Sequence, residues 1–124
     1  MPYGFDFNFA GTKSGSPPRG YWPPHPKAPG LKNAPQDEYL TDRLTDEAIG
    51  FIQRNHDRSW FLYLTHFAVH TPLQGRPDLV AKYESRPKGN LHDHAVMAAM
   101  IESVDTGVGR ILTTLDRKST RLNS

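Results

Sequence analysis

Two histidines that could do chemistry follow a run of large apolar residues near the middle of the chain. His66 and His70 come after Trp60–Leu64, and Pro72 stands two residues beyond His70. Near neutral pH an imidazole can donate a hydrogen bond to an anionic oxygen and can protonate a departing alkoxide. Pro72 has no N–H to extend a strand and it biases Thr71 away from helix, so the sequence predicts a loop at His70.

The apolar run itself predicts a strand that is buried on both faces. Residues 60–64 read Trp-Phe-Leu-Tyr-Leu with no polar alternation, which is typical of a parallel sheet covered by helices on both sides. In open α/β sheets, ligands bind just beyond the carboxyl ends of the strands. The sequence therefore predicts an α/β fold, with a site at His66 and His70 directly after the strand.

Two amphipathic helices are predicted to flank this strand. Apolar residues recur at spacings of three and four over 39–57 and again over about 92–115, and a short helical turn is expected near 77–84. Gly107 and Gly109 interrupt the second helix, and each costs roughly 1 kcal/mol relative to alanine in a helix interior. A closely approaching neighbour would be a packing reason for glycine at these positions.

Residues 1–38 form a segment rich in proline and glycine. Eight of the 11 prolines lie between residues 2 and 38, and each fixes φ and removes a hydrogen-bond donor, so a long irregular loop over a larger body is expected. The alternation of aromatic residues from Tyr3 to Phe9 predicts one short strand. His25 and Trp22 could line a sugar pocket, with ordinary loop packing as the alternative.

Composition bounds the partners of the chain. The 124 residues include no cysteine, which excludes disulfides and thiolate metal sites. The net charge is +2, but the last nine residues hold three basic residues and one acidic residue, so the rest of the chain is neutral and a nucleic-acid partner is not expected. No apolar run approaches membrane-spanning length, and no membrane partner is expected.

The histidines also raise the question of a metal site. His66, His70, His92 and His94 could form a zinc site, but no cysteine or carboxylate completes an obvious ligand set. We therefore expect no metal ligands in this chain.

Several stretches, in this order and spacing, resemble the central part of a formylglycine-dependent (type I) sulfatase. They are Tyr39–Ala48, Phe61–Leu64, His66–Leu73, Ala98–Asp105 and Val108–Arg110. The resemblance is closest to bacterial arylsulfatases of the alkaline-phosphatase-like superfamily and covers nearly everything from Tyr3 to Leu115. It implies a partial alkaline-phosphatase-like fold and a sulfuric ester hydrolase acting on a sulfated carbohydrate or an aryl sulfate.

The resemblance also implies a role for each matching residue. In such sulfatases a histidine in a His-x-Pro motif after the strand contacts the sulfate and serves the leaving oxygen as acid, and here that position is His70. Apart from the resemblance, His66 is expected to be a hydrogen-bonded wall residue of the substrate site rather than a metal ligand. The Cys/Ser-x-Pro-x-Arg motif of the formylglycine nucleophile, the Gly-Lys-x-His motif and the aspartate and asparagine pairs that hold calcium (Ca2+) have no counterpart in this sequence.

These gaps lead to an expectation about the extent of the chain. Residues 1–115 are expected to be an internal fragment of a sulfatase catalytic domain, inactive alone and, in the parent protein, periplasmic or secreted. Residues 116–124 resemble the translation of a sequencing adapter, with a solvated basic helix end as the alternative.

Two alternative functions remain. One is a phosphodiesterase or phosphonate hydrolase of the same superfamily. The other is a non-catalytic domain that binds a ligand through the aromatic N-terminal loop. An upstream Cys/Ser-x-Pro-x-Arg motif would separate them.

Overall fold

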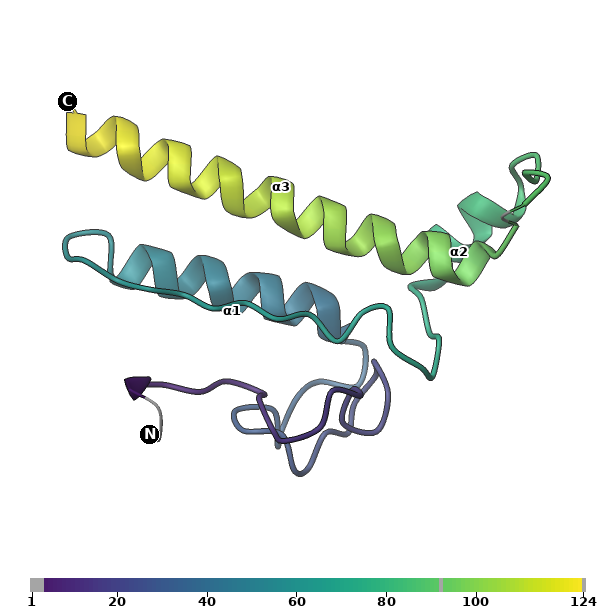
Figure 1. Cartoon of the computed structure of the whole chain (residues 1–124), viewed down its shortest axis with the longest axis horizontal. Helices are drawn as coiled ribbons and strands as arrows, with labels where there is room; N and C mark the ends of the chain where they lie inside the picture. Colours follow the sequence, from purple (N-terminus) through teal and green to yellow (C-terminus); the bar gives the residue numbers. More distant parts are fainter. Residues whose placement is uncertain (1–3, 92, 124) are drawn as a thin grey trace.

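The structure, a computed structural model, describes residues 4–91 and 93–123 and contains three helices there. They are α1 (Leu40–Arg54), α2 (Pro77–Glu84) and α3 (Ala95–Asn123). α1 and α3 pack side by side and run in the same direction, while the chain after α1 turns back along it before reaching α2 (Figure 1). None of the described helices is long and apolar enough to cross a membrane.

α1 forms where the sequence predicts a helix and buries one stripe of its surface. Leu40, Leu44, Ala48 and Ile52, each four residues apart, are buried. The helix ends at Arg54, three residues before the predicted boundary, because Asn55 caps it: the Asn55 N–H and Nδ2 both donate to the carbonyl of Phe51, at 3.1 and 2.8 Å. α1 thus supplies one wall of the core.

The predicted second helix is α3, and a glycine brings it close to α1. Gly107 is buried, and a Cβ built there would overlap the Thr45 hydroxyl, so the expected packing reason holds at this position. Gly109 is exposed and has no atom within 4 Å of such a Cβ, so that reason fails there. An ion pair between Arg110 of α3 and Asp46 of α1, at 2.6 Å, also links the two helices.

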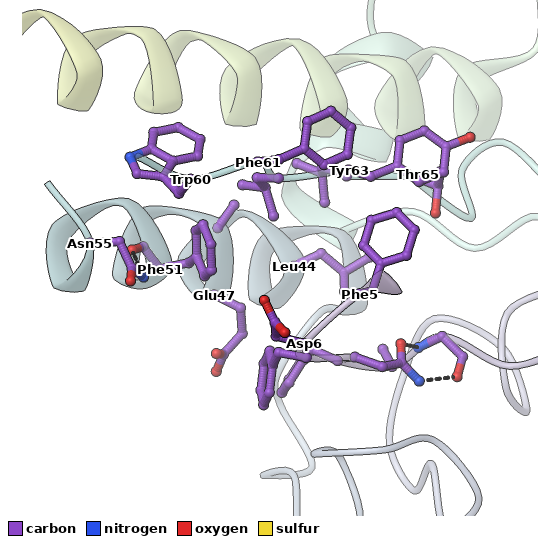
Figure 2. Close-up of a pocket in the computed structure, with 18 of the residues that line it drawn as sticks. Phe5, Asp6, Leu44, Glu47, Phe51, Asn55, Trp60, Phe61, Tyr63 and Thr65 are labelled. Carbon is purple, nitrogen blue, oxygen red and sulfur yellow. Dashed lines mark hydrogen bonds between the residues drawn. The ribbon is translucent and has the colours of Figure 1, made fainter. Parts of the chain in front are cut away.

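The buried parallel strand is not confirmed. The segment that contains residues 60–65 runs extended along α1 (Figures 1 and 2). Neither these nor any other described residues form a strand. Phe61 and Tyr63 are 73% and 71% exposed, whereas Leu62 and Leu64 are half-buried. An extended segment becomes a strand only when a neighbour satisfies its backbone groups, and no described segment lies in register beside this one.

The N-terminal segment is irregular, as predicted, yet much of it is tightly packed. Tyr21 and Leu31 are buried in one cluster with Tyr39, Leu40 and residues of α3. Backbone hydrogen bonds hold its turns, among them Leu31 N–H to Ala28 O at 3.0 Å, and the bond from Leu40 N–H to Tyr21 O at 2.9 Å joins the segment to the start of α1. The predicted strand over residues 3–9 is absent from 4–9, and Tyr3 lies outside the described residues.

The two glycines of α3 provide a matched test of this packing. We expect Gly107→Ala to lower the free energy of unfolding by roughly 1 kcal/mol, because the overlap with the buried, β-branched Thr45 costs about 1–3 kcal/mol and outweighs the helix-propensity gain. Gly109→Ala should instead raise it by up to about 1 kcal/mol. Urea unfolding of the protein measures both, and a shift of both variants in the same direction would contradict the close α1–α3 contact.

Candidate functional site

His70 lies in the loop after the extended segment, with its backbone and one ring nitrogen held. Its N–H donates to the carbonyl of Phe67 at 2.8 Å, and its ring Nδ1 lies 2.7 Å from the carbonyl of Thr71. Because a carbonyl oxygen only accepts, Nδ1 carries a proton in this contact. The side chain is exposed, so Nε2 is the nitrogen left to meet a substrate.

Three residues that the sequence analysis did not identify hold this loop through hydrogen bonds. We call them the Tyr21–Gln74–Tyr39 network. The Tyr21 hydroxyl donates to the carbonyl of His70 at 2.8 Å, and the Tyr21 N–H donates to Gln74 Oε1 at 2.8 Å. The Tyr39 hydroxyl donates to the carbonyl of Gln74 at 2.6 Å. No spacing in the sequence could have identified the network, because its members come from three separate segments.

Both phenols of this network are protonated near neutral pH, and burial makes their ionisation still less favourable. Burial raises the pKa of Tyr21, against a smaller lowering by its hydrogen bond to the His70 backbone. Burial likewise raises the pKa of Tyr39 to about 12. Both hydroxyls therefore remain hydrogen-bond donors across the physiological pH range.

His66 differs from His70 in its surroundings. The side chain is half-buried, and burial lowers its pKa, so the ring is neutral near pH 7. Its Nδ1 is buried and has no hydrogen-bond partner among the described residues, so the expected hydrogen bond is not found at that atom. A neutral ring with one shielded nitrogen is poorly suited to give a proton.

The other two predicted site residues are packed inside the N-terminal segment. His25 is 1% exposed, with Nδ1 2.7 Å from the carbonyl of Pro18. Trp22 is half-buried against Tyr39, with ring centroids 5.0 Å apart. This is the loop packing named as the alternative above, and a role of His25 and Trp22 in sugar binding stays a prediction.

A cavity of 1170 Å³ lies between the N-terminal segment, α1 and the extended segment. Figure 2 shows Trp60, Phe61 and Tyr63 along one side of it, with Phe5 and Phe51 from the other two elements. The rings of Phe5 and Phe61 are 6.0 Å apart, and those of Phe51 and Trp60 are 5.7 Å apart. Eight of the 23 lining residues are aromatic, and Asp6, Glu47, Arg54 and Arg58 add charge. Neither His66 nor His70 is among the lining residues, so this cavity is not the place of His70 chemistry.

A second cavity, of 580 Å³, is formed by the N-terminal segment alone and has three basic residues among those that line it. Lys13, Arg19 and Lys27 line it together with hydroxyl and proline side chains, and no carboxylate is among the lining residues. We call these three residues the basic cluster. It lies in the same segment that reaches the His70 loop through Tyr21.

The described residues do not fit a metal site. Over 4–91 and 93–123, no three histidine, aspartate or glutamate side chains gather as ligands. His92, one of the four histidines of the zinc hypothesis, lies outside the described residues.

Comparison with known proteins gives one consistent result. The family model described as "Sulfatase" matches residues 3–124. A sulfatase of Formosa agariphila is 37% identical over 82 residues, which is 64% of this chain and 15% of that protein. Human steryl-sulfatase is 39% identical over 77 residues, which is 62% of this chain and 12% of that protein. The chain thus spans about one seventh of the length of these relatives.

Solved structures give the same answer. The crystal structure of Ps i-CgsB has a TM-score of 0.57 and 33% identity, over 66% of this chain and 18% of that one. A second structure of that protein, in complex with k-i-k-neocarrahexaose, matches equally well. The family match includes residues 116–124, and α3 continues to Asn123. Neither observation tests where these residues come from, so an adapter origin of the tail stays a prediction.

Proposed function

Because this chain belongs to the sulfatase family, we propose that the protein carrying it hydrolyses sulfate esters and that His70 is the acid for the leaving oxygen. The observation that carries the assignment is the hydrogen bond from His70 Nδ1 to the Thr71 carbonyl, in an exposed loop. That bond leaves Nε2 as the atom that can face the ester. His66, half-buried and neutral, would form part of the wall beside it.

The chemical role of His70 follows from the needs of the reaction. To act as an acid, the Nδ1–H ring first binds a second proton at Nε2. The resulting imidazolium donates Nε2–H to the bridging oxygen of the ester and transfers that proton as the oxygen departs. This avoids release of a free alkoxide and returns the ring to its Nδ1–H form. Such general acid help contributes roughly 10²–10⁴-fold, far less than an unactivated sulfate ester requires. The sequence has no cysteine and no Cys/Ser-x-Pro-x-Arg motif, so we expect the 124-residue chain by itself to be inactive.

The uncovered aromatic side of residues 60–65 supports a further part of the proposal, that this segment is a central strand of the sheet in the complete domain. Phe61 and Tyr63 are more than 70% exposed and border the 1170 Å³ cavity. In a complete sheet, neighbouring strands would pair with the backbone of this segment, and an element packed on the face of the sheet would cover the two rings. Covering both rings removes large apolar surfaces from water, which is the main driving force for such packing.

Hydrogen exchange tests this strand. In the complete protein we expect the amides of residues 61–64 to exchange as slowly as those of the α1 core, because both would open only on global unfolding. The exposed loop at 86–90 is the internal control and should exchange fast. Rapid exchange at 61–64 in a protein whose α1 is protected would contradict a strand within the sheet.

Replacement of His70 tests the assigned acid. In the complete protein, His70→Ala should lower kcat for an alkyl sulfate by about 10²–10⁴-fold, since the leaving alkoxide needs a proton. The loss should be smaller for nitrophenyl sulfate, whose leaving group needs less protonation. His56→Ala is the matched control, because His56 is also exposed and also bonds a backbone carbonyl through Nδ1, that of Gln53 at 2.9 Å.

The same assay weighs the alternatives. His66→Ala should cost much less than His70→Ala. Wild-type turnover of an alkyl sulfate by the His70→Ala variant would show that His70 is a structural residue. A wild-type protein that prefers phosphodiesters or phosphonates would favour the other hydrolases of the superfamily, and one that binds saccharides without turnover would favour a non-catalytic domain.

We further propose that the substrate is a carbohydrate that bears more than one sulfate, and the basic cluster supports this proposal. Residues 9–36 contain four lysine or arginine residues and no aspartate or glutamate. Three of the four line the 580 Å³ cavity, in the segment that contacts the His70 loop. A second sulfate on the same saccharide would meet complementary charge there, and the oligosaccharide bound by Ps i-CgsB supports a carbohydrate ligand.

Neutralising the cluster tests this substrate class. The variant with Lys13→Ala, Arg19→Ala and Lys27→Ala should raise KM for a polysulfated oligosaccharide by about tenfold, since exposed charge contacts contribute roughly 0.2–1 kcal/mol each. KM for a small aryl monosulfate should stay unchanged. Lys32→Ala, in the same segment but outside the cavity lining, is the control. Equal effects on both substrates would contradict the assignment.

A further inference from the structure

The carbonyl of His70 accepts a hydrogen bond from a fully buried tyrosine that comes from a distant part of the chain. Tyr21 is 0% exposed, and its hydroxyl lies 2.8 Å from His70 O, across 49 residues of sequence. On the other side of the same residue, the His70 N–H donates to Phe67 O at 2.8 Å. The two peptide groups that flank the His70 Cα are therefore both fixed.

Fixing the backbone also fixes the ring. The acceptor for His70 Nδ1 is the carbonyl of Thr71, the next residue, at 2.7 Å. The ring orientation therefore depends on the backbone geometry between His70 and Thr71. The Tyr21 hydroxyl holds this geometry through its hydrogen bond to the His70 carbonyl. If this loop shifts, the Nδ1 contact changes, and the direction of Nε2 changes with it.

Tyr21 is in turn anchored to the core. Its N–H donates to Gln74 Oε1 at 2.8 Å, and its carbonyl accepts from the N–H of Leu40, the first residue of α1. Its ring stacks on that of Tyr39, with centroids 5.9 Å apart. Gly20 has a φ of 89°, a left-handed conformation that favours glycine, and a Cβ there would press on the Gln74 side chain. The loop of His70 is thereby connected to the start of α1.

We propose that Tyr21, supported by Gln74, is a positioning residue for catalysis, which orients the His70 imidazole so that Nε2 faces the leaving oxygen. This inference rests on the proposed role of His70 as the acid. Tyr21 does not touch the ester and acts only through the backbone of His70. Its donor function persists at neutral pH because a tyrosine hydroxyl ordinarily ionises only near pH 10, and burial raises the pKa of Tyr21 further.

The test uses Tyr21→Phe in the complete protein, which removes the hydroxyl and keeps the buried ring. We expect kcat for an alkyl sulfate to fall about 10- to 100-fold, the order of loss produced by a small misplacement of a catalytic group. KM should stay near the wild-type value, and the loss for nitrophenyl sulfate should be smaller. Tyr83→Phe is the matched control, since the Tyr83 hydroxyl donates to Glu102 at 2.7 Å between α2 and α3. This variant should behave as wild type with both substrates.

A second readout does not depend on turnover. Nitrogen NMR of the His70 ring in the same protein should show the Nδ1–H form in the wild type and in Tyr83→Phe, and a mixture of tautomers in Tyr21→Phe. Gln74→Met, which removes the acceptor for the Tyr21 N–H while keeping side-chain length, should give the same change and replaces Tyr21→Phe if that variant does not fold.

The outcomes separate the two proposals. If wild-type protein hydrolyses no sulfate ester, the proposed function fails, and the tautomer of His70 still decides the positioning role of Tyr21. If His70→Ala discriminates between alkyl and aryl sulfates but Tyr21→Phe lowers both equally, or lowers neither, then Tyr21 is only structural and the inference is overturned. An unchanged tautomer in both Tyr21→Phe and Gln74→Met would also overturn it.

Discussion

The hydrogen bonds of Tyr21 join the N-terminal segment to the loop of His70 and to the start of α1. Its hydroxyl meets the loop of His70, its carbonyl meets the first residue of α1, and it belongs to the N-terminal segment itself. An irregular segment of this length forms few regular backbone hydrogen bonds of its own, and it can be ordered only by contacts with other elements. The burial of Tyr21 and Leu31 supplies those contacts, and the position of the site follows from them.

His66 and His70 differ in burial and hydrogen bonding, and this difference suits them to different roles. His66 and His70 are four residues apart and chemically identical, yet burial lowers the pKa of one while the other is exposed, with Nδ1 bound to a carbonyl. A half-buried neutral ring shapes a wall, whereas an exposed ring with one nitrogen held can direct the other toward a ligand. The resemblance to sulfatases implies a role for His70 alone, and the local geometry supplies a physical reason why the two rings differ.

Membership of the sulfatase family also explains the incomplete appearance of the core. α1 and α3 contact each other through Thr45 and Gly107, while Phe61 and Tyr63 on the segment beside them remain in solvent. Exposed aromatic residues on an extended segment keep apolar surface in contact with water, which is unfavourable. Such residues are typical of surfaces that another element covers. The chain spans about one seventh of its relatives, so most of what those proteins contain has no counterpart among the described residues.

The amino-acid sequence by itself determined the elements that depend on local order. The spacing of Leu40, Leu44 and Ile52 predicted α1, the prolines predicted an irregular N-terminal segment, and Pro72 predicted a loop at His70; all three are confirmed. Periodicity and proline geometry act over a few residues, which is why they can be read directly. Only the tertiary structure decided that Tyr21 and Gln74, 53 residues apart, form one hydrogen bond beneath His70, and that Gly107 but not Gly109 faces Thr45. The same holds for residues 60–65: an apolar pattern describes what a segment can bury, but a strand exists only where a neighbouring backbone accepts and donates its hydrogen bonds.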